Sequence, residues 1–178
     1  LIEAFDINKI NKAGAVFDVK KLNWMNGQYI KNMDVEAYLK EARKWLVDVD
    51  VNEEKLDTAL MAVKTSLSTF RDIPEKLSVF TGDPAKPEDE AKAMLELVST
   101  KSVFKAYVEK VSALDELTVD AFKAVMKDVQ TETGVKGKNL WMPVRIGLTG
   151  EMHGPELGYI VEYLGKYENI RRINDWIL

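Results

Sequence analysis

Arg145 is the only charged residue between Asn139 and Glu151, and it follows Pro143 by two positions in an otherwise apolar segment. A guanidinium presents a planar fork of donors that suits base edges and phosphates better than an ammonium does. Pro143 removes a backbone hydrogen bond from a helical run and is expected to kink it. Because positions that break a folding rule tend to be functional, this segment is a candidate recognition site. The ordinary alternative is that Arg145 pairs with a nearby carboxylate.

The turn that follows contains the single histidine, His153, directly before Gly154-Pro155-Glu156-Leu157. Pro155 predicts a helix start, and the first turn of a helix has free backbone N–H groups that can face an anion. Such proline-started helices are also common where nothing binds. No neighbouring residue suggests a nucleophile, so we interpret His153 as a polar turn residue and not as a general base.

Little else in the sequence could carry out catalysis. The chain has no Cys, which excludes disulfides, thiol catalysis and cysteine zinc sites and fits a reducing cytosol. One His excludes multi-histidine metal sites, and the glycines near Gly150 are too widely spaced for a dinucleotide fingerprint. Carboxylate pairs such as Glu53 and Asp57 are expected on solvated helix faces. We therefore predict no catalytic residue, no metal and no cofactor within this chain.

Composition restricts the partners. Hydrophobic residues make up 46% of the 178, charged residues 30%, and the net charge is −4, as in an ordinary soluble domain. A strongly basic domain would be the usual footprint of nucleic-acid binding, so any RNA contact must come from a local surface. No apolar run approaches the ~18 residues of a membrane span. We expect a cytoplasmic monomer without membrane or DNA partners. The start at Leu1 lacks Met and any signal peptide, which indicates a piece of a longer protein.

The periodicity predicts an all-α fold, since apolar residues recur at helical spacing and no segment alternates like a strand for long. Asp18, Asp34 and Asn52 are predicted N-caps, Pro74 and Pro87 predicted helix starts, and Gly134 a predicted helix end. Thr118 is placed as an N-cap between a stapling pair, Leu117 and Phe122. The apolar stripes expected to face inward comprise Leu22, Met25 and Tyr29; Tyr38, Leu39, Ala42, Trp45 and Leu46; Leu56, Leu60, Val63 and Leu67; Ala91, Leu95 and Val98; and Val103, Tyr107, Val111 and Leu114.

The segment Thr81–Pro87 is the best boundary in the sequence, because it has two prolines and one glycine and no apolar stripe. We predict two consecutive helical bundles on either side of it. The expected organisation is a tail of a preceding region at 1–14, a first helical subdomain at 15–80, a linker at 81–87 and a second helical subdomain at 88–178.

Phe17–Ile30 combines aromatics, amides and two lysines in an order that amphipathicity does not require. The simplest expectation is that Leu22, Trp24 and Tyr29 belong to the core. Lys20 and Lys21 are by default solvated, and contact with an RNA backbone is the sharper hypothesis.

These blocks resemble a known family. VFDVKKLNWMNGQYI at 16–30, the proline-started helix at Ile73–Lys76, LWMPVRIGLTG with HGPEL, and LGKYENIRRI are similar to the C-terminal part of bacterial-type glutamyl-tRNA synthetases. The resemblance covers nearly the whole chain from Ala13 onward, and its two end blocks are the specific ones. Leu1–Lys12 would be the tail of a preceding stem-contact domain.

The resemblance implies a class I aminoacyl-tRNA synthetase, a ligase that charges tRNA(Glu) with glutamate for protein biosynthesis using ATP and Mg²⁺. The signatures of the catalytic domain, His-x-Gly-His and Lys-Met-Ser-Lys-Ser, do not occur in this sequence. The chain alone is therefore expected to be non-catalytic and to form the α-helical cage that binds the anticodon.

Site residues follow from the matching positions. The resemblance implies that Arg145 contacts an anticodon base and that Pro155 and Leu157 pack on neighbouring bases, while Gly154 offers only backbone groups. Lys20, Lys21 and Lys64 are candidates for phosphate contacts. The family's strict enzymes have a further Arg, which our alignment puts near 64–66, where this chain has none. Charging of tRNA(Gln) as well therefore stays open.

Two alternatives remain at this stage. An all-α protein-interaction module without RNA binding would explain the negative charge, but not the combination of Pro143, Arg145 and the turn at His153. The anticodon domain of a class I lysyl-tRNA synthetase has a similar helical cage, but HGPEL and LGK favour glutamate.

Overall fold

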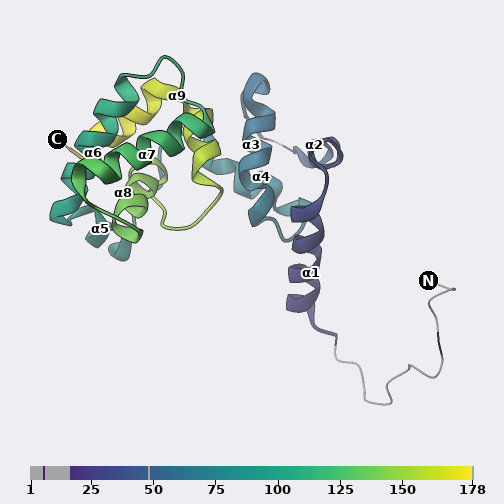
Figure 1. Ribbon diagram of the computed structural model, residues 1–178. Helices are drawn as coiled ribbons and strands as arrows, with labels where there is room; N and C mark the ends of the chain where they lie inside the picture. The colour runs from purple at the N-terminus through teal and green to yellow at the C-terminus, as the bar shows by residue number, and fades with distance from the viewer. Residues whose placement is uncertain (1–5, 7–16, 48, 178) are drawn as a thin grey trace.

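The structure is a computed structural model that describes residues 6, 17–47 and 49–177. Every regular element within these residues is helical, which confirms the all-α prediction. The helices form two lobes, and α1 projects from the first of them (Figure 1). Apart from Asp6, the predicted tail at 1–14 lies outside the described residues. The α-helices are α1 (Val19–Asn32), α2 (Val35–Ala42), α3 (Leu56–Val63), α4 (Ile73–Leu77), α5 (Asp89–Leu95), α6 (Val98–Ser112), α7 (Val119–Thr133), α8 (Lys138–Thr149) and α9 (Leu157–Asn174).

Side-chain caps start the helices where the sequence predicted them. Oδ1 of Asp18 accepts a hydrogen bond from the backbone N–H of Lys21 at 3.0 Å, and Thr118 caps α7 between the buried pair Leu117 and Phe122. These side chains satisfy backbone donors that have no partner inside the helix. The predicted end of α7 is also confirmed. The predicted side-chain caps at Asp18, Asp34, Asn52 and Thr118 are all present.

The first lobe is built around the buried face of α3. Its predicted stripe is buried throughout, and the hydroxyl of Tyr38 on α2 donates to the carbonyl of Leu60 at 2.7 Å. Burial raises the pKa of Tyr38, which keeps this hydroxyl protonated as a donor. The ring of Phe70 stacks on Tyr38 with centroids 6.1 Å apart. One tyrosine thus joins α2 to α3 inside the core.

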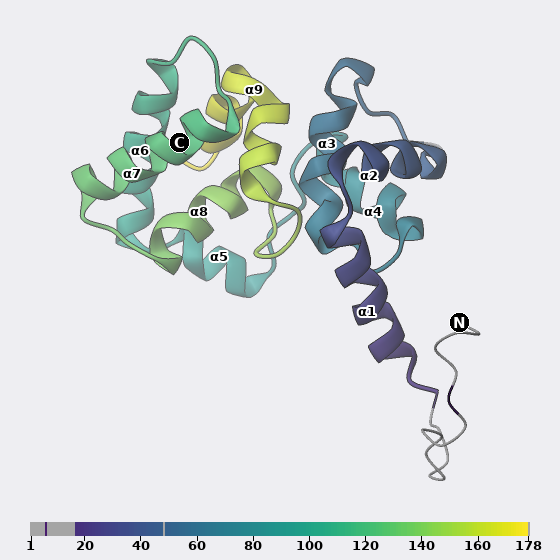
Figure 2. The ribbon, with the colours of Figure 1, turned by 45° about the vertical axis from the view of Figure 1, so that its right-hand side comes forward.

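The second lobe packs α6, α7, α8 and α9 around another core (Figure 2). The predicted residues Val103, Tyr107 and Val111 of α6 are fully buried. The Tyr107 hydroxyl donates to Oδ1 of Asn169 at 2.9 Å, and Nδ2 of Asn169 donates to the carbonyls of Val161 and Gly165. A buried polar network of this kind is stable because each group has its partner.

Helix α9 belongs to both lobes. Its backbone leaves helical geometry at Gly165, where φ is 71°, so it consists of two pieces. Ile160 and Tyr163 of the first piece lie in the first lobe's core, and the Tyr163 ring is 4.6 Å from that of Phe80. Ile173 of the second piece lies in the other core. The division into subdomains at 15–80 and 88–178 stays a prediction. Helix α9 lies within the second range, but its first piece packs in the core of the first lobe.

The segment 81–87 lies against the second lobe. Nη2 of Arg172 donates to the carbonyl of Gly82 at 2.8 Å, and the N–H of Ala85 donates to the carbonyl of Thr149 at 3.0 Å. Gly150 has φ of 77°, and a Cβ there would lie only 1.8 Å from the oxygen of Ala85. Only glycine allows the segment to pass this close.

Two predictions about buried faces are wrong. Val98 was expected in the stripe of α5, but it begins α6 and is exposed. Leu22, Met25 and Tyr29 were expected to face inward and Trp24 to belong to the core, but all four are exposed, and Ile30 is the buried residue of α1. No helix in the described part of the chain is long and apolar enough to cross a membrane.

Candidate nucleic-acid interface

Helix α8 carries Arg145 one turn before its C-terminal end. The helix continues through Pro143, which is buried together with Val144 and Ile146. The half-buried Arg145 extends toward the turn 150–156, and its Nη1 donates to the carbonyl of Pro155 at 3.0 Å. The partner of this guanidinium is therefore a backbone oxygen and not the carboxylate that the ordinary alternative required.

Burial lowers the pKa of Arg145, and the nearby carboxylate of Glu151 acts in the opposite direction. A guanidinium nonetheless stays charged in proteins, since its ordinary pKa exceeds about 12. Among the described residues, Pro155 is the hydrogen-bond partner of this side chain. Arg145 thus combines a fixed position with donors left over for an incoming acceptor, which is the arrangement of a preorganised recognition group.

The turn itself is held from several sides. Oγ1 of Thr149 accepts a hydrogen bond from the N–H of Glu151 at 3.1 Å, and Gly154 has φ of 151°. The N–H of Glu156 donates to the carbonyl of Ala62 on α3 at 2.9 Å. One backbone donor at the start of α9 is therefore already used between the lobes. The free N–H groups predicted at this helix start therefore do not include that of Glu156.

Pro155 and Leu157 are less accessible than residues that pack on anticodon bases should be. Both are buried, and Leu157, with 7% of its surface exposed, belongs to the core of the second lobe. Gly154 is exposed and lies beside Arg145, because a Cβ on it would be 3.7 Å from Nη1. The structure therefore brings Arg145, Gly154 and Pro155 together, and it places Leu157 behind them.

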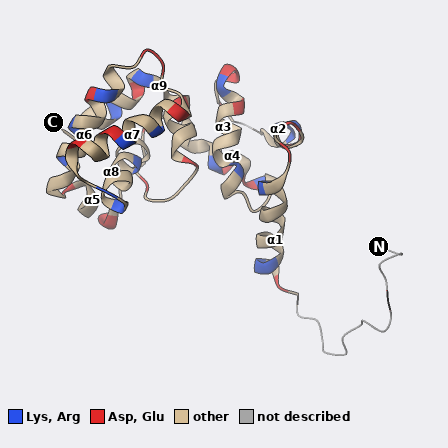
Figure 3. Ribbon diagram, in the orientation of Figure 1, with Lys and Arg blue, Asp and Glu red and all other residues tan. Residues whose placement is uncertain are grey.

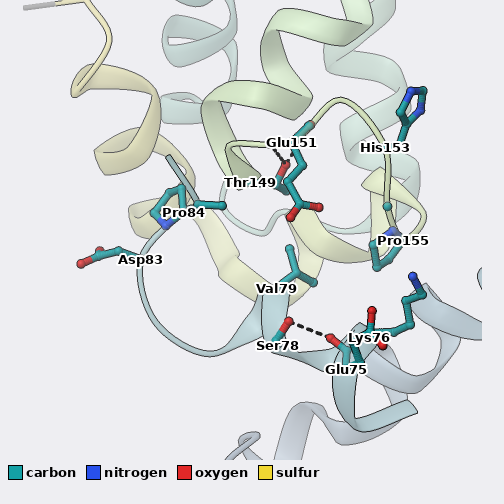
Figure 4. A pocket seen from close by; sticks show the side chains of 12 residues that line it. Glu75, Lys76, Ser78, Val79, Asp83, Pro84, Thr149, Glu151, His153 and Pro155 are labelled. Atoms are coloured by element: carbon teal, nitrogen blue, oxygen red, sulfur yellow. Dashed lines mark hydrogen bonds between the residues drawn. The ribbon is translucent and has the colours of Figure 1, made fainter. Parts of the chain in front are cut away.

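A cavity of about 420 Å³ opens between the lobes beside this turn. Figure 4 shows the side chains around it, with Glu151 and Thr149 on one side and Ser78, Glu75 and Lys76 on the other; the ring of His153 is turned away from these. The cavity lining holds three carboxylates and one ammonium, so it suits neutral donor groups better than phosphates. It is lined by Glu75, Lys76, Ser78, Val79, Asp83, Pro84, Ala85, Thr149, Glu151, His153, Gly154 and Pro155.

The three candidate phosphate-binding lysines differ in environment. Lys20 and Lys21 are exposed at the start of α1, where Figure 3 shows basic residues on the projecting helix. Lys64 is buried; its Nζ donates to the carbonyl of Met33 at 2.6 Å and lies 5.3 Å from the ring centre of Tyr38. A phosphate contact by Lys64 stays a prediction, and this geometry speaks against it because the ammonium is occupied inside the lobe.

The sequence reasoning missed a buried arginine. Arg172 is 3% exposed and donates to the carbonyls of Leu148 and Gly82 and to the Glu168 carboxylate. Hydrogen bonds from Arg171 and Arg172 lower the pKa of Glu168 to about 2. The signal in the sequence was the spacing of Glu168 and Arg172 by four residues, which places them on one helix face. This cluster holds the segment 81–87, and with it one wall of the cavity.

No metal site was predicted, and the described residues contain no group of three or more His, Asp or Glu side chains that could hold a metal ion.

Comparison with known proteins gives a consistent result. A family model described as an anticodon binding domain matches residues 37–177. The glutamate–tRNA ligase of Bacillus licheniformis is 37% identical over 184 residues, which cover 99% of this chain and 38% of the relative. The glutamate–tRNA ligase of Bacillus subtilis is also 37% identical, with 98% of this chain and 38% of the relative covered.

Solved structures agree in fold. A glutamate tRNA ligase from Elizabethkingia meningosepticum, in complex with its amino acid, superposes with a TM-score of 0.75 at 31% identity. A glutamate-tRNA synthetase from Elizabethkingia anophelis gives a TM-score of 0.73 at the same identity. Each comparison covers 97% of this chain and 35% or 34% of the solved chain. The chain thus spans little more than a third of the proteins it resembles.

Proposed function

Because this chain belongs to the anticodon binding domain family, we propose that it is the anticodon-binding part of a glutamate–tRNA ligase. The partner is tRNA(Glu), whose anticodon the two lobes receive while another region of the same protein attaches glutamate with ATP and Mg²⁺. Such a ligase acts in the cytoplasm, where translation uses its product. We infer a monomer, and charging of tRNA(Gln) as well remains part of the proposal to be tested.

The observation that carries the proposal is the hydrogen bond between Arg145 and the carbonyl of Pro155. It holds a planar donor group beside a cavity that is open between the lobes. Anticodon bases are single-stranded, so they can be splayed out and read on their edges. Arg145 donates to a base edge, Gly154 lets a base approach the backbone, and the exposed Lys20 and Lys21 contact phosphates without reading sequence.

The charge of the cavity supports base recognition over backbone binding. Glu75, Asp83 and Glu151 repel phosphate, while Lys76 is the one ammonium among the cavity's lining residues. Carboxylates accept hydrogen bonds from base amino groups, and Arg145 offers the complementary donors. We therefore place at least one anticodon base in this cavity.

The test is a competition titration with the whole ligase. Wild-type tRNA(Glu) competes against transcripts that carry single changes at each anticodon position and against a stem-loop of unrelated sequence. We expect single anticodon changes to weaken binding by roughly tenfold or more, in line with about 1–3 kcal/mol per base contact. Equal binding of all transcripts would reject the proposal.

Two competing functions predict different results. A helical protein-interaction module would bind no tRNA above the unrelated stem-loop. An anticodon domain of a class I lysyl-tRNA synthetase would prefer tRNA(Lys) in the same titration. Including that transcript therefore separates all three.

A further inference from the structure

The first piece of α9 joins the two lobes. Ile160 and Val161 are adjacent and fully buried, yet Ile160 lies in the core of the first lobe and Val161 in that of the second. Figure 2 shows this part of α9 on the side of the second lobe that faces α3. Apolar contacts have no preferred direction, so they do not by themselves fix how the helix is placed between the lobes.

Polar contacts fix this piece of α9 to the first lobe at both ends. At its start, the N–H of Glu156 donates to the carbonyl of Ala62 at 2.9 Å. Near its end, Nζ of Lys55 donates to the carbonyl of Tyr163 at 2.6 Å, and the Tyr163 hydroxyl accepts from the N–H of Asn52 at 3.2 Å. An anchor at each end determines the direction of the helix axis relative to the first lobe.

Glu162 makes the corresponding polar contact with the second lobe. Its Oε2 accepts a hydrogen bond from the N–H of Val119, the first residue of α7, at 2.7 Å. Its Oε1 accepts from Oγ1 of Thr58 on α3 at 3.4 Å. A carboxylate at the start of a helix satisfies a donor that has no partner within the helix, and the helix dipole favours the negative charge. One half-buried carboxylate thus contacts elements of both lobes.

Helices α7 and α9 approach closely beside this contact. A Cβ on the buried Gly158 would lie 3.1 Å from Cγ1 of Val119, which is tighter than ordinary van der Waals contact. Gly158 and Glu162 are four residues apart, so they share one face of α9. The glycine lets the start of α7 come near, and the carboxylate binds its N–H.

We propose that Glu162 is a positioning residue, which holds the two lobes at the separation needed to read the anticodon. The cavity of about 420 Å³ is lined by Glu75 of the first lobe and by Glu151 of the second, so a rotation of one lobe against the other changes its width. Groups that recognise a ligand must be held to within about 0.5 Å of their productive positions. Glu162 is not among the residues that line this cavity, and it acts through α7 and α3. The inference rests on the proposed function, because it assumes that the cavity takes a base.

The test measures lobe spacing and anticodon discrimination in the same variants of the full-length ligase. Genetically encoded spin-labelled residues replace the exposed Lys40 on α2 and Lys127 on α7, and double electron–electron resonance gives the distribution of distances between them. Glu162→Ala should broaden this distribution by about twofold or more, because domains without a firm interface move relative to one another. It should also lower the discrimination at the anticodon position that the cavity reads by about fivefold or more, the low end of what one base contact supplies.

Three further variants complete the design. Glu162→Gln keeps an oxygen that can accept from the N–H of Val119, so it should retain the wild-type spacing and discrimination. Glu116→Ala removes an exposed carboxylate from the loop before α7 and should change neither. Gly158→Ala acts on the same joint without touching the carboxylate. Its new methyl group displaces Val119, so it should also shift or broaden the distances, which keeps the inference testable if Glu162→Ala fails to fold.

Two results would overturn the inference. A Glu162→Ala ligase that melts at a lower temperature but keeps the wild-type distances would show that Glu162 only caps α7. Broadened distances with unchanged discrimination would show that reading the anticodon does not depend on lobe spacing. The distance measurement uses no tRNA. A wild-type ligase that binds all anticodon transcripts equally would therefore reject the proposed function, while the distances still decide whether Glu162 holds the lobes.

Discussion

Nη1 of Arg145 lies 3.0 Å from the main-chain oxygen of Pro155, so one side chain of α8 holds the turn that leads into α9. A substitution at Arg145 therefore changes two things at once. It removes a donor group beside the cavity, and it releases the turn that forms part of the cavity's wall.

Arg145→Lys and Arg145→Ala separate these effects. A lysine retains the charge and can donate to a carbonyl, but it lacks the planar fork. We expect Arg145→Lys to preserve the melting temperature and to lose about 1–3 kcal/mol of discrimination between anticodons. Arg145→Ala should lower the melting temperature and also lose the discrimination between anticodons. The measurements are the anticodon competition titration and thermal unfolding of each variant.

Lys20→Ala is the control, because Lys20 is exposed and touches at most a phosphate. It should leave the anticodon preference intact and lower the salt slope of binding by about one. If Arg145→Lys keeps the wild-type preference, Arg145 serves only to hold the turn.

Gly150→Ala tests the close approach of the segment 81–87. The new Cβ would meet the oxygen of Ala85 at 1.8 Å, and φ is 77°. Gly134 has a similar φ of 70° but no atom within 4 Å of its Cβ position. We expect Gly134→Ala to cost about 1–2 kcal/mol of unfolding free energy, from the left-handed backbone alone. Gly150→Ala should cost clearly more in urea denaturation, and equal costs would show that the segment moves aside freely.

Acid should weaken the cluster around Glu168. The pKa of Glu168 is about 2 in the folded protein and 4.5 for the free side chain, so folding favours the ionised form. This contribution is fully present above pH 4.5 and is lost as the pH falls toward 2. Glu168→Gln removes it. The melting temperatures of wild type and variant should therefore differ most at neutral pH and converge in acid. A difference that is independent of pH would contradict the assignment.

Tyr107→Phe tests the buried network at Asn169. Loss of the hydroxyl leaves Oδ1 of Asn169 without the donor it now has at 2.9 Å. Leaving a buried acceptor unsatisfied costs about 1–3 kcal/mol, which equilibrium unfolding in urea can resolve. Tyr167→Phe removes the same atom from an exposed ring and should change the unfolding free energy by less than about 0.5 kcal/mol.

Limited proteolysis tests the segment Thr81–Pro87, where we expect cleavage before any cut within the helices on either side. Arg171 is paired with Asp83 at 3.0 Å. Arg171→Ala should therefore speed cleavage there several-fold. Arg43→Ala removes another exposed arginine with two carboxylate partners, Glu53 and Asp57, in the first lobe. It should leave the cleavage rate in the segment unchanged. An early cut inside Val103–Leu114 would contradict the division into two bundles.

The sequence was most informative where structure depends on near neighbours. Asp18 and Thr118 cap their helices through groups three residues away, so local spacing was sufficient to place them. The stripe of α3 was correct for the same reason, since a helical period alone determines which residues share a face.

The sequence was least informative where the partners of a residue lie far away along the chain. Nothing near Lys64 indicates that its ammonium reaches Met33, and nothing near Trp24 shows that its helix face has no neighbour within the described chain. For the candidate site, the sequence identified Arg145 and the turn that follows it as parts of one recognition site. It could not show that Glu156 is tied to Ala62 or that Leu157 is buried, because both depend on how α9 packs against α3 and the second core.

Because α9 contributes residues to both cores, it determines the order in which the chain can fold during synthesis. Ile160 and Tyr163 complete a core whose other members end at Phe80. Domains generally fold as they leave the ribosome, starting at the N-terminus. Here the residues made first must wait for residues made much later. Until α9 emerges, the earlier lobe exposes the apolar face of α3 and the ring of Phe80, which makes the nascent chain a natural client for a chaperone.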